Sequence, residues 1–329
     1  MWFFLDLIDR RLVFELSANC RATYRALAKS LNLSPNAIKN RIANLVERGV
    51  ILRFTVGLTP IMMDAEDIIA IVFTDGTENS DILISRIGRI PCVFNVAPLI
   101  NPQGGSYFIN GLCTSPAMIA ELGSTLRTQK EVQSVEMHRE YWDESLSLSQ
   151  ISYPAMMKLS PDRVKKIEFT KSQIQVLSCL VEDARMPIKD ISSRTGMTPK
   201  TVRRILNQLE PGKGILYYPR LNFTVGGFVD AWVRMRWDNK KSSLRALSQW
   251  LQSQFPDELL ALFISSSDAV IFADLLVDSI EDVYSISNQI RNAAFIKSTT
   301  TLVASASYAF DRLTEVELRK IVENPKTEI

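Results

Sequence analysis

Two short segments of the chain carry polar side chains that could hydrogen-bond to nucleic-acid bases. In each segment apolar residues recur every three or four positions, so at 3.6 residues per turn the polar residues between them share the opposite face of a helix. Asn, Arg and Lys can bond to base edges in the major groove, and Lys and Arg also pair with phosphates. The outward face and its edges comprise Asn36, Lys39, Asn40, Ala43, Asn44 and Glu47 in the first segment, and Lys200, Thr201, Arg203, Arg204, Asn207 and Gln208 in the second. The candidates for contact with nucleic acid are Asn36, Lys39, Asn40 and Asn44, and Lys200, Thr201, Arg203, Arg204 and Asn207.

The sequence indicates where both helices begin. Ser34 and Thr198 each precede a proline, which is typical of an N-cap residue followed by proline at the first helical position. The N-terminal turns of a recognition helix are the part that reaches bases, so both cap residues join the candidate set. The second helix has three cations within five residues, where the first has one lysine. The alternative is a solvated polar face that binds protein or nothing.

Both helices lie within an internal repeat. At an offset of 164, Leu16 aligns with Leu180, Arg21 with Arg185 and Leu45 with Leu209. Each copy predicts three helices followed by a β-rich stretch, the pattern of a winged helix-turn-helix, and we expect Arg53 and Arg220 on the wings to anchor phosphates. The inward residues of the two reading helices are expected to be Ile38, Ile42 and Leu45 in copy one, and Val202, Leu206 and Leu209 in copy two.

Each copy is followed by segments that alternate between strand and helix patterns. Both sets have the order βαββαβ, which predicts two ferredoxin-like domains. The expected segments of the first are 67–73, 80–90, 93–100, 106–113, 115–127 and 132–142, and those of the second are 231–237, 243–255, 258–265, 269–277, 279–292 and 299–310.

The predicted fold class is α+β, with two winged helix-turn-helix domains alternating with two ferredoxin-like βαββαβ domains. The winged domains are expected at 1–58 and 167–222, and the ferredoxin-like domains at 59–145 and 223–312. A linker is expected at 146–166, and a terminal helix that frays at 313–329.

The net charge of +2 conceals an alternating pattern. Residues 1–55 carry nine Lys/Arg and four Asp/Glu, and residues 161–225 carry twelve and six. Residues 56–160 carry six Lys/Arg against twelve Asp/Glu, and residues 226–329 carry eleven against fourteen. Only the basic quarters can gain affinity by releasing counterions from phosphates. Lys/Arg richness for solubility alone is the alternative.

Composition argues against several other classes. The four cysteines are scattered without a CxxC pair, and the chain has one histidine, so neither a disulfide framework nor a zinc site is expected. The apolar start of the chain is too short for a signal peptide and no apolar run is long enough to span a bilayer. We therefore expect a cytoplasmic protein with no membrane partner, metal or cofactor.

The run LDLIDRRLVFEL…NCR…ALAKSLNLSPNAIKNRIANLVERGVILRF resembles the N-terminal domain of the leucine-responsive regulatory protein/AsnC transcription factors. In that family a βαββαβ domain for effector binding and oligomerisation follows, so the resemblance covers nearly the whole chain twice over. It implies a small-molecule site, for an effector such as an amino acid, around the turn between the second and third strands. The matching positions are Asn101, Gly104 and Gly105 in the first copy and Ser266, Ser267 and Asp268 in the second. The family's Gly…Asp pattern is only half present in each.

The resemblance also supplies an enzymatic alternative. Sirohaem decarboxylases resemble paired AsnC-like units and rely on histidine and arginine in the ferredoxin-like half. Here the one histidine, His138, is expected to be a half-exposed structural residue, and the sequence contains no GxSxG, P-loop or GxGxxG motif. We therefore expect a regulator rather than an enzyme.

The prediction is a sequence-specific regulator of transcription that binds double-stranded DNA through helices 35–48 and 199–210 in successive major grooves. The two ferredoxin-like sheets of one chain are expected to pair with each other, and further self-association could use the same domains. A co-regulator that does not bind DNA and a sirohaem decarboxylase-like enzyme are the alternatives.

Overall fold

The computed structural model describes residues 5–101, 105–140, 169–209, 214–266 and 269–324. These residues form two compact units. The winged-helix unit contains residues 11–65, 169–221 and 311–324, and the sheet unit contains residues 5–10, 66–140 and 222–310. The predicted linker at 146–166 lies outside the described residues.

Both predicted helix-turn-helix domains are present. The first consists of α1 (Leu7–Ala18), α2 (Tyr24–Ser30), α3 (Pro35–Glu47) and β1 (Ile51–Leu58). The second consists of α7 (Lys171–Glu182), α8 (Ile188–Thr195), α9 (Pro199–Gln208) and β6 (Ile215–Leu221). The terminal helix α12 (Leu313–Glu323) completes the winged-helix unit.

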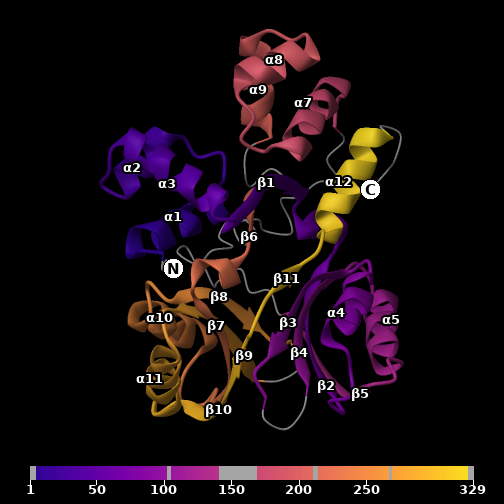
Figure 1. Cartoon of the computed structure of the whole chain (residues 1–329), viewed down its shortest axis with the longest axis vertical. Helices are drawn as coiled ribbons and strands as arrows, with labels where there is room; N and C mark the ends of the chain where they lie inside the picture. The colour runs from indigo at the N-terminus through magenta and orange to yellow at the C-terminus, as the bar shows by residue number, and fades with distance from the viewer. Residues whose placement is uncertain (1–4, 102–104, 141–168, 210–213, 267–268, 325–329) are drawn as a thin grey trace. The chain divides into compact units, whose positions relative to one another are not determined.

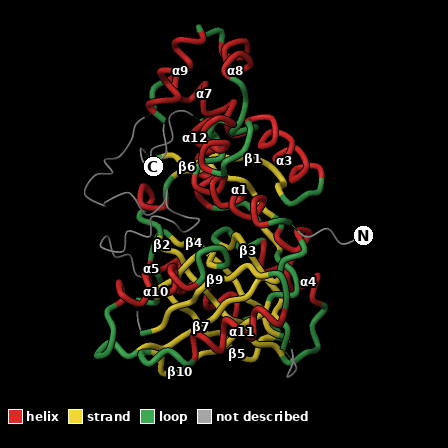
Figure 2. Tube along the Cα trace, turned by 90° about the vertical axis from the view of Figure 1, so that its left-hand side faces the viewer, coloured by secondary structure: helices red, strands yellow, loops and turns green. Residues whose placement is uncertain are grey.

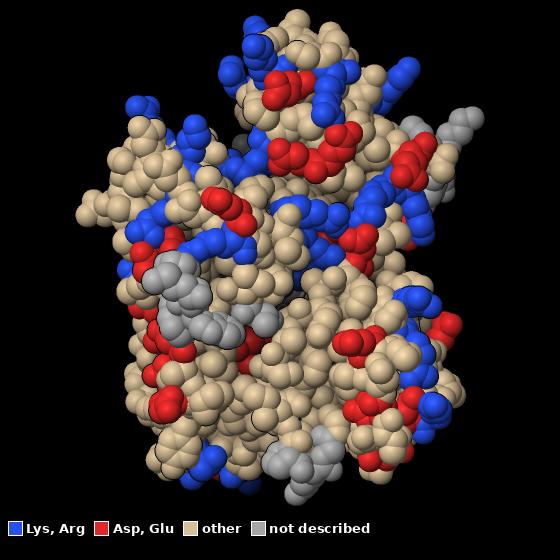
Figure 3. All heavy atoms as spheres, in the orientation of Figure 1, with Lys and Arg blue, Asp and Glu red and all other residues tan. Residues whose placement is uncertain are grey.

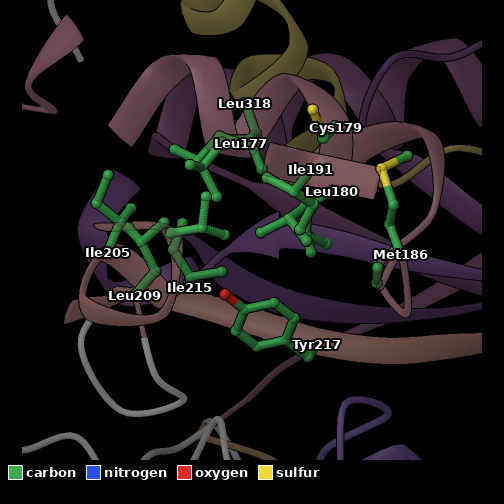
Figure 4. Close-up of a cluster of buried hydrophobic side chains, with 14 of the residues drawn as sticks. Leu177, Cys179, Leu180, Met186, Ile191, Ile205, Leu209, Ile215, Tyr217 and Leu318 are labelled. Atoms are coloured by element: carbon green, nitrogen blue, oxygen red, sulfur yellow. The ribbon is translucent and has the colours of Figure 1, made fainter. Parts of the chain in front are cut away.

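The core of the second domain draws on every element of that domain and on α12. Leu177 and Leu180 of α7, Ile191 of α8, Ile205 of α9 and Leu318 of α12 converge in one buried cluster (Figure 4). Helix α12 contributes buried side chains over Leu313–Glu323, and the fraying of the terminal helix stays a prediction.

The inward face of α9 is wider than the sequence pattern indicates. Val202, Ile205 and Leu209 are buried, whereas Leu206, predicted as the inward residue, is only partly buried. The inward set of α3, Ile38, Ile42 and Leu45, is buried as predicted.

Strands β1 and β6 pair with each other. They form a two-stranded antiparallel sheet with Arg53 opposite Arg220 and Leu58 opposite Ile215 (Figure 2). The expected wings are therefore one shared ribbon between the two helix-turn-helix domains.

The sheet unit contains both βαββαβ domains. The first has β2 (Glu66–Thr74), α4 (Ser80–Gly88), β3 (Val93–Leu99), β4 (Ser106–Cys113), α5 (Pro116–Arg127) and β5 (Val132–Arg139). The second has β7 (Val229–Trp237), α10 (Leu244–Gln254), β8 (Leu259–Ile264), β9 (Val270–Val277), α11 (Ile280–Arg291) and β10 (Ile296–Val303). The antiparallel strand orders are β3-β4-β2-β5 and β10-β7-β9-β8, which is the ferredoxin-like arrangement. Short 3₁₀ turns at Pro60–Met63 and Phe223–Gly226 precede β2 and β7.

The two sheets pack face to face within one chain, as predicted. Helices α4 and α5 cover the outer face of one sheet, and α10 and α11 cover that of the other (Figure 1). Between the sheets the rings of Phe108 and Trp232 stack with centroids 4.4 Å apart, and Phe272 meets Phe108 edge to face. This layer buries apolar side chains from both sheets, which is the main force that holds the pair together.

The chain crosses over after β10. The strand predicted at 299–310 is divided in two, because β10 ends at Val303 and a two-residue strand, β11 (Tyr308–Ala309), pairs with β3 of the other domain. Phe310 then packs against the helices of the first domain. The second domain therefore extends the sheet of the first. No helix among the described residues is both long and apolar enough to cross a membrane.

Candidate nucleic-acid interface

Local interactions fix the first turn of both reading helices. The Ser34 hydroxyl accepts a hydrogen bond from the Ala37 amide at the start of α3, and the Thr198 hydroxyl accepts one from the Thr201 amide at the start of α9. Proline follows each cap, where its missing N–H is not needed by the helix. Both helices therefore begin where the sequence predicts.

The outward face of α3 is open over its whole length. Asn36, Lys39, Asn40 and Asn44 are all exposed. Three amides and one ammonium group on consecutive turns can bond to base edges but provide little charge for phosphates. The face of α3 is therefore better suited to reading bases than to electrostatic attraction.

The outward face of α9 is exposed and more basic. Lys200, Arg203, Arg204 and Asn207 are exposed, and Thr201 is half-buried beside the cap. Among the residues that the structure describes, no carboxylate pairs with Lys200, Arg203 or Arg204. Lys and Arg side chains project from the region of α8 and α9 at the top of the view in Figure 3. Three cations without a carboxylate partner on one helix face form the strongest candidate for phosphate contact.

The structure gives Arg53 and Arg220 a different environment from the one predicted. Arg53 lies 2.8 Å from Asp311 and 2.9 Å from Glu315. Arg220 lies 3.3 Å from Asp311 and 3.6 Å from Glu315, and only 11% of its side chain is exposed. Both arginines on the shared ribbon pair with Asp311, just before α12, and with Glu315 of α12, so neither is an unpaired cation on a free wing, although Arg53 remains 44% exposed.

This ion network is buried at its centre. Glu315 is 1% exposed, and the Tyr218 hydroxyl donates a 2.7 Å hydrogen bond to it. Burial, together with the charge of Glu315, raises the pKa of Tyr218 well above its ordinary value. Burial lowers the pKa of Arg220. The network thus holds α12 to the ribbon, and sequence could not show this because its partners are about 90 to 260 residues apart.

The structure also brings together two arginines to which the sequence assigned no role. Arg21 and Arg185, equivalent in the repeat, each donate hydrogen bonds to backbone carbonyls in the loop that carries the other. Their alignment in the repeat was the only sequence signal.

The first effector candidate is a close backbone turn. Gly105 accepts hydrogen bonds from the amide and the hydroxyl of Thr74, at 2.9 and 3.0 Å. A side chain at Gly105 would collide with Glu78. The absence of a side chain at Gly105 therefore allows its backbone to lie close to Thr74 and Glu78. Asn101 is half-buried at the start of the turn, and Gly104 lies outside the described residues.

The second effector candidate is partly described. The Ser266 amide donates a 2.8 Å hydrogen bond to the Arg139 carbonyl of the first domain, and Ile100 makes the equivalent bond to Val303 of the second. Ser267 and Asp268 lie outside the described residues. Each turn therefore lies against the last strand of the opposite domain.

His138 is buried between the two sheets, so the expectation of a half-exposed residue is wrong. It is 3% exposed, its Nδ1 lies 3.3 Å from the Ser265 hydroxyl, and its Nε2 lies 3.1 Å from a Glu136 carboxylate oxygen. Arg234 pairs with the same carboxylate, with a 2.9 Å hydrogen bond to its other oxygen, and Phe272 meets the imidazole edge to face. Both ring nitrogens therefore have protein partners.

Two pairs of carboxyl groups also lie in the sheet unit. Asp230 and Asp274, on adjacent strands β7 and β9, share a hydrogen bond, and burial raises the pKa of Asp230 to about 6. Burial and the neighbouring Asp230 raise the pKa of Asp274 well above its ordinary value. Burial, and then the charge of Asp67, does the same for Glu140. Each pair is stable when it holds a proton.

Comparison with known proteins supports the helix-turn-helix assignment. A family model described as winged helix-turn-helix DNA-binding matches residues 5–51 and 169–210. An uncharacterized HTH-type transcriptional regulator of Pyrococcus horikoshii is 38% identical over 96 residues, which are 28% of this chain and 64% of that protein. The chain thus spans less than two thirds of the length of this relative.

Two solved structures match this chain to different extents. The siroheme decarboxylase NirDL, solved with an iron-uroporphyrin III analogue, superposes with a TM-score of 0.54 at 10% identity, covering 97% of this chain and 100% of its own. AsnC of E. coli is 23% identical, covers 43% of this chain and 95% of its own, and has a TM-score of 0.33. The first likeness extends over both copies and shows that the tandem fold has a precedent.

Proposed function

We propose that the chain is a tandem protein of the leucine-responsive regulatory protein/AsnC type and a sequence-specific DNA-binding regulator of transcription. The observation that carries the proposal is the exposed polar face of α9, where Lys200, Arg203 and Arg204 stand without a carboxylate partner in the described chain. The exposed amides of α3 add a second reading face.

The two reading faces have different chemistry. Helix α9 would contact phosphates through Lys200, Arg203 and Arg204 and base edges through Asn207 and the same arginines. Thr198 and Thr201 lie at its first turn. Helix α3 would read mainly through amides, so the two half-sites of an operator would differ in sequence. Arg53 and Arg220 are engaged by α12 and are not part of the proposed contact.

The charge on α9 gives a direct test. Fluorescence anisotropy with duplexes selected from a random pool measures affinity against salt. Replacing both Arg203 and Arg204 with alanine should weaken binding and flatten the slope of log K against log salt by about 0.9 for each phosphate that the variant no longer neutralises. The matched control, Arg89→Ala with Lys240→Ala, removes two exposed cations of the sheet unit. An equal effect of the control, or an unchanged slope, would assign binding to net charge or to another face.

A small-molecule effector, further self-association through the βαββαβ domains and a cytoplasmic location extend this proposal. The turns at Asn101–Gly105 and Ser265–Asp268 are where an effector such as an amino acid would bind. A rise in the unfolding temperature in the presence of one of the standard amino acids would identify an effector. Light scattering with and without that amino acid would measure the assembly.

The likeness to NirDL over the whole chain raises a second candidate, tetrapyrrole chemistry. The described residues do not fit it well, because His138 is buried with both ring nitrogens held by Ser265 and Glu136. Absorbance of the protein mixed with iron-uroporphyrin III decides between the two, since a shifted Soret band would favour the enzyme. A third candidate, a co-regulator that binds only protein, predicts no affinity for any duplex at low salt.

A further inference from the structure

Arg21 and Arg185 make reciprocal contacts across the winged-helix unit. Arg21 donates to the carbonyls of Ala184 and Met186, the latter at 3.3 Å. Arg185 donates to the carbonyls of Cys20 and Ala22, the latter at 3.3 Å. Subtracting the repeat offset of 164 from 184, 185 and 186 gives 20, 21 and 22, so each arginine bonds to the neighbours of the other.

The backbones of the same loops dock on the shared ribbon. The Cys20 amide donates a 3.0 Å hydrogen bond to Tyr217 of β6, and the Ala184 amide donates a 3.2 Å hydrogen bond to Phe54 of β1. The first loop therefore contacts the strand of the second copy, and the second loop contacts the strand of the first. Together with the β1–β6 ladder, these bonds join the two domains in an isologous manner.

The arginines lie in partly desolvated surroundings. Burial is the main cause of a lowered pKa at Arg21. The Arg185 guanidinium lies 5.0 Å from the ring centre of Tyr24 and 5.4 Å from that of Phe54. Hydrogen bonds from a charged donor are about twice as strong as neutral ones, and removing such a donor leaves buried carbonyls without a partner. These contacts resist sliding or rotation of one domain against the other.

We propose that Arg21 and Arg185 are positioning residues that hold α3 and α9 at one separation and orientation, so that the protein reads two half-sites at a single spacing. This inference rests on the proposed DNA-binding function. In helix-turn-helix dimers the half-site spacing mirrors the geometry of the protein, because both helices must reach the major groove together. A flexible connection between two binding modules would tolerate several spacings.

The first experiment tests, without DNA, whether Arg21 and Arg185 fix the distance between the two helix-turn-helix domains. Spin labels on cysteines introduced at Lys29 and Ser193, exposed positions of α2 and α8 that are equivalent in the repeat, report the distance between the domains. The native cysteines are buried and stay unlabelled. We expect a single narrow distance distribution that broadens when Arg21 and Arg185 are both replaced by alanine. The control Arg25→Ala with Lys189→Ala removes an equivalent pair of exposed cations and should leave it narrow.

The single variants Arg21→Ala and Arg185→Ala each keep one of the two arginines. They allow the test to proceed if the double variant does not fold. Each should broaden the distribution to an intermediate extent. A distribution that stays narrow in both single variants and in the folded double variant overturns the proposal.

The second experiment tests spacing on DNA. Duplexes carry the selected half-sites separated by spacers of increasing length. The native chain should prefer one spacing by about tenfold, and the double alanine variant should bind several spacings to within about twofold, with the same half-site sequences. An unchanged spacing preference contradicts the positioning role. If the native chain binds no duplex, the proposed function fails, while the spin-label distances still decide whether the arginines fix the domains.

Discussion

The Asp230–Asp274 carboxyl pair makes the stability of the protein depend on pH. Burial raises the pKa of Asp230 from 3.8 to about 6, so the folded state holds a proton that the unfolded chain has released. Below pH 4 both states are protonated at this site, and the pair costs little. As the pH rises above 4, ionisation favours the unfolded chain, so stability falls. Above pH 6 the contribution of Asp230 is constant, while Asp274, whose folded-state pKa lies well above its ordinary value, continues to lower stability. A pKa difference of roughly two, at 1.36 kcal/mol for each pH unit, corresponds to about 3 kcal/mol.

Replacing Asp230 with asparagine removes this titration and gives Asp274 an amide donor. We expect the free energy of unfolding to rise by roughly 2–3 kcal/mol near pH 7 and to change little near pH 4. Urea titrations across this range measure it. Glu121→Gln, an isosteric change at an exposed position in the same unit, is the control and should be neutral throughout. A variant that loses stability at pH 7, or that keeps the native dependence on pH, would refute the shared-proton interpretation.

Two further substitutions test the packing. Glu315→Gln removes the buried charge that Arg53 and Arg220 share and should cost about 3–5 kcal/mol of stability in urea titrations. The control Glu317→Gln, in an exposed pair, should cost less than about 1 kcal/mol, and equal effects would show that the network is not a buried ion cluster. Gly88→Ala places a methyl group into the Phe310 ring and should cost about 1–3 kcal/mol of stability. Near-ultraviolet circular dichroism reports the displaced aromatic ring, and an unchanged spectrum and stability would mean that Phe310 moves aside freely.

Local periodicity predicted most of the fold. The caps at Ser34 and Thr198, the outward residues of α3 and α9 and the order of both βαββαβ domains follow from spacing within a dozen residues. Such patterns show which face of a helix is polar. They do not show what another part of the chain places against that face.

The differences between the predicted and the observed environments of these residues all arise from contacts with distant parts of the chain. Arg220 has the composition of a phosphate anchor, but Glu315, far along the chain, neutralises it. His138 resembles a strand-edge residue until the second sheet covers it. Ile205, and not Leu206, is buried in the cluster to which α12 and β1, distant in sequence, also contribute side chains. A sequence pattern records local geometry, whereas these environments come from tertiary packing.

The face-to-face packing of Phe108 on Trp232 joins two halves of a single polypeptide. Association of those halves is unimolecular, so it does not weaken on dilution as it would between separate subunits. One copy can also change its surface without imposing the same change on the other. Asn40 and Arg204 occupy equivalent positions in the repeat, yet one is an amide and the other a cation, so such divergence has occurred.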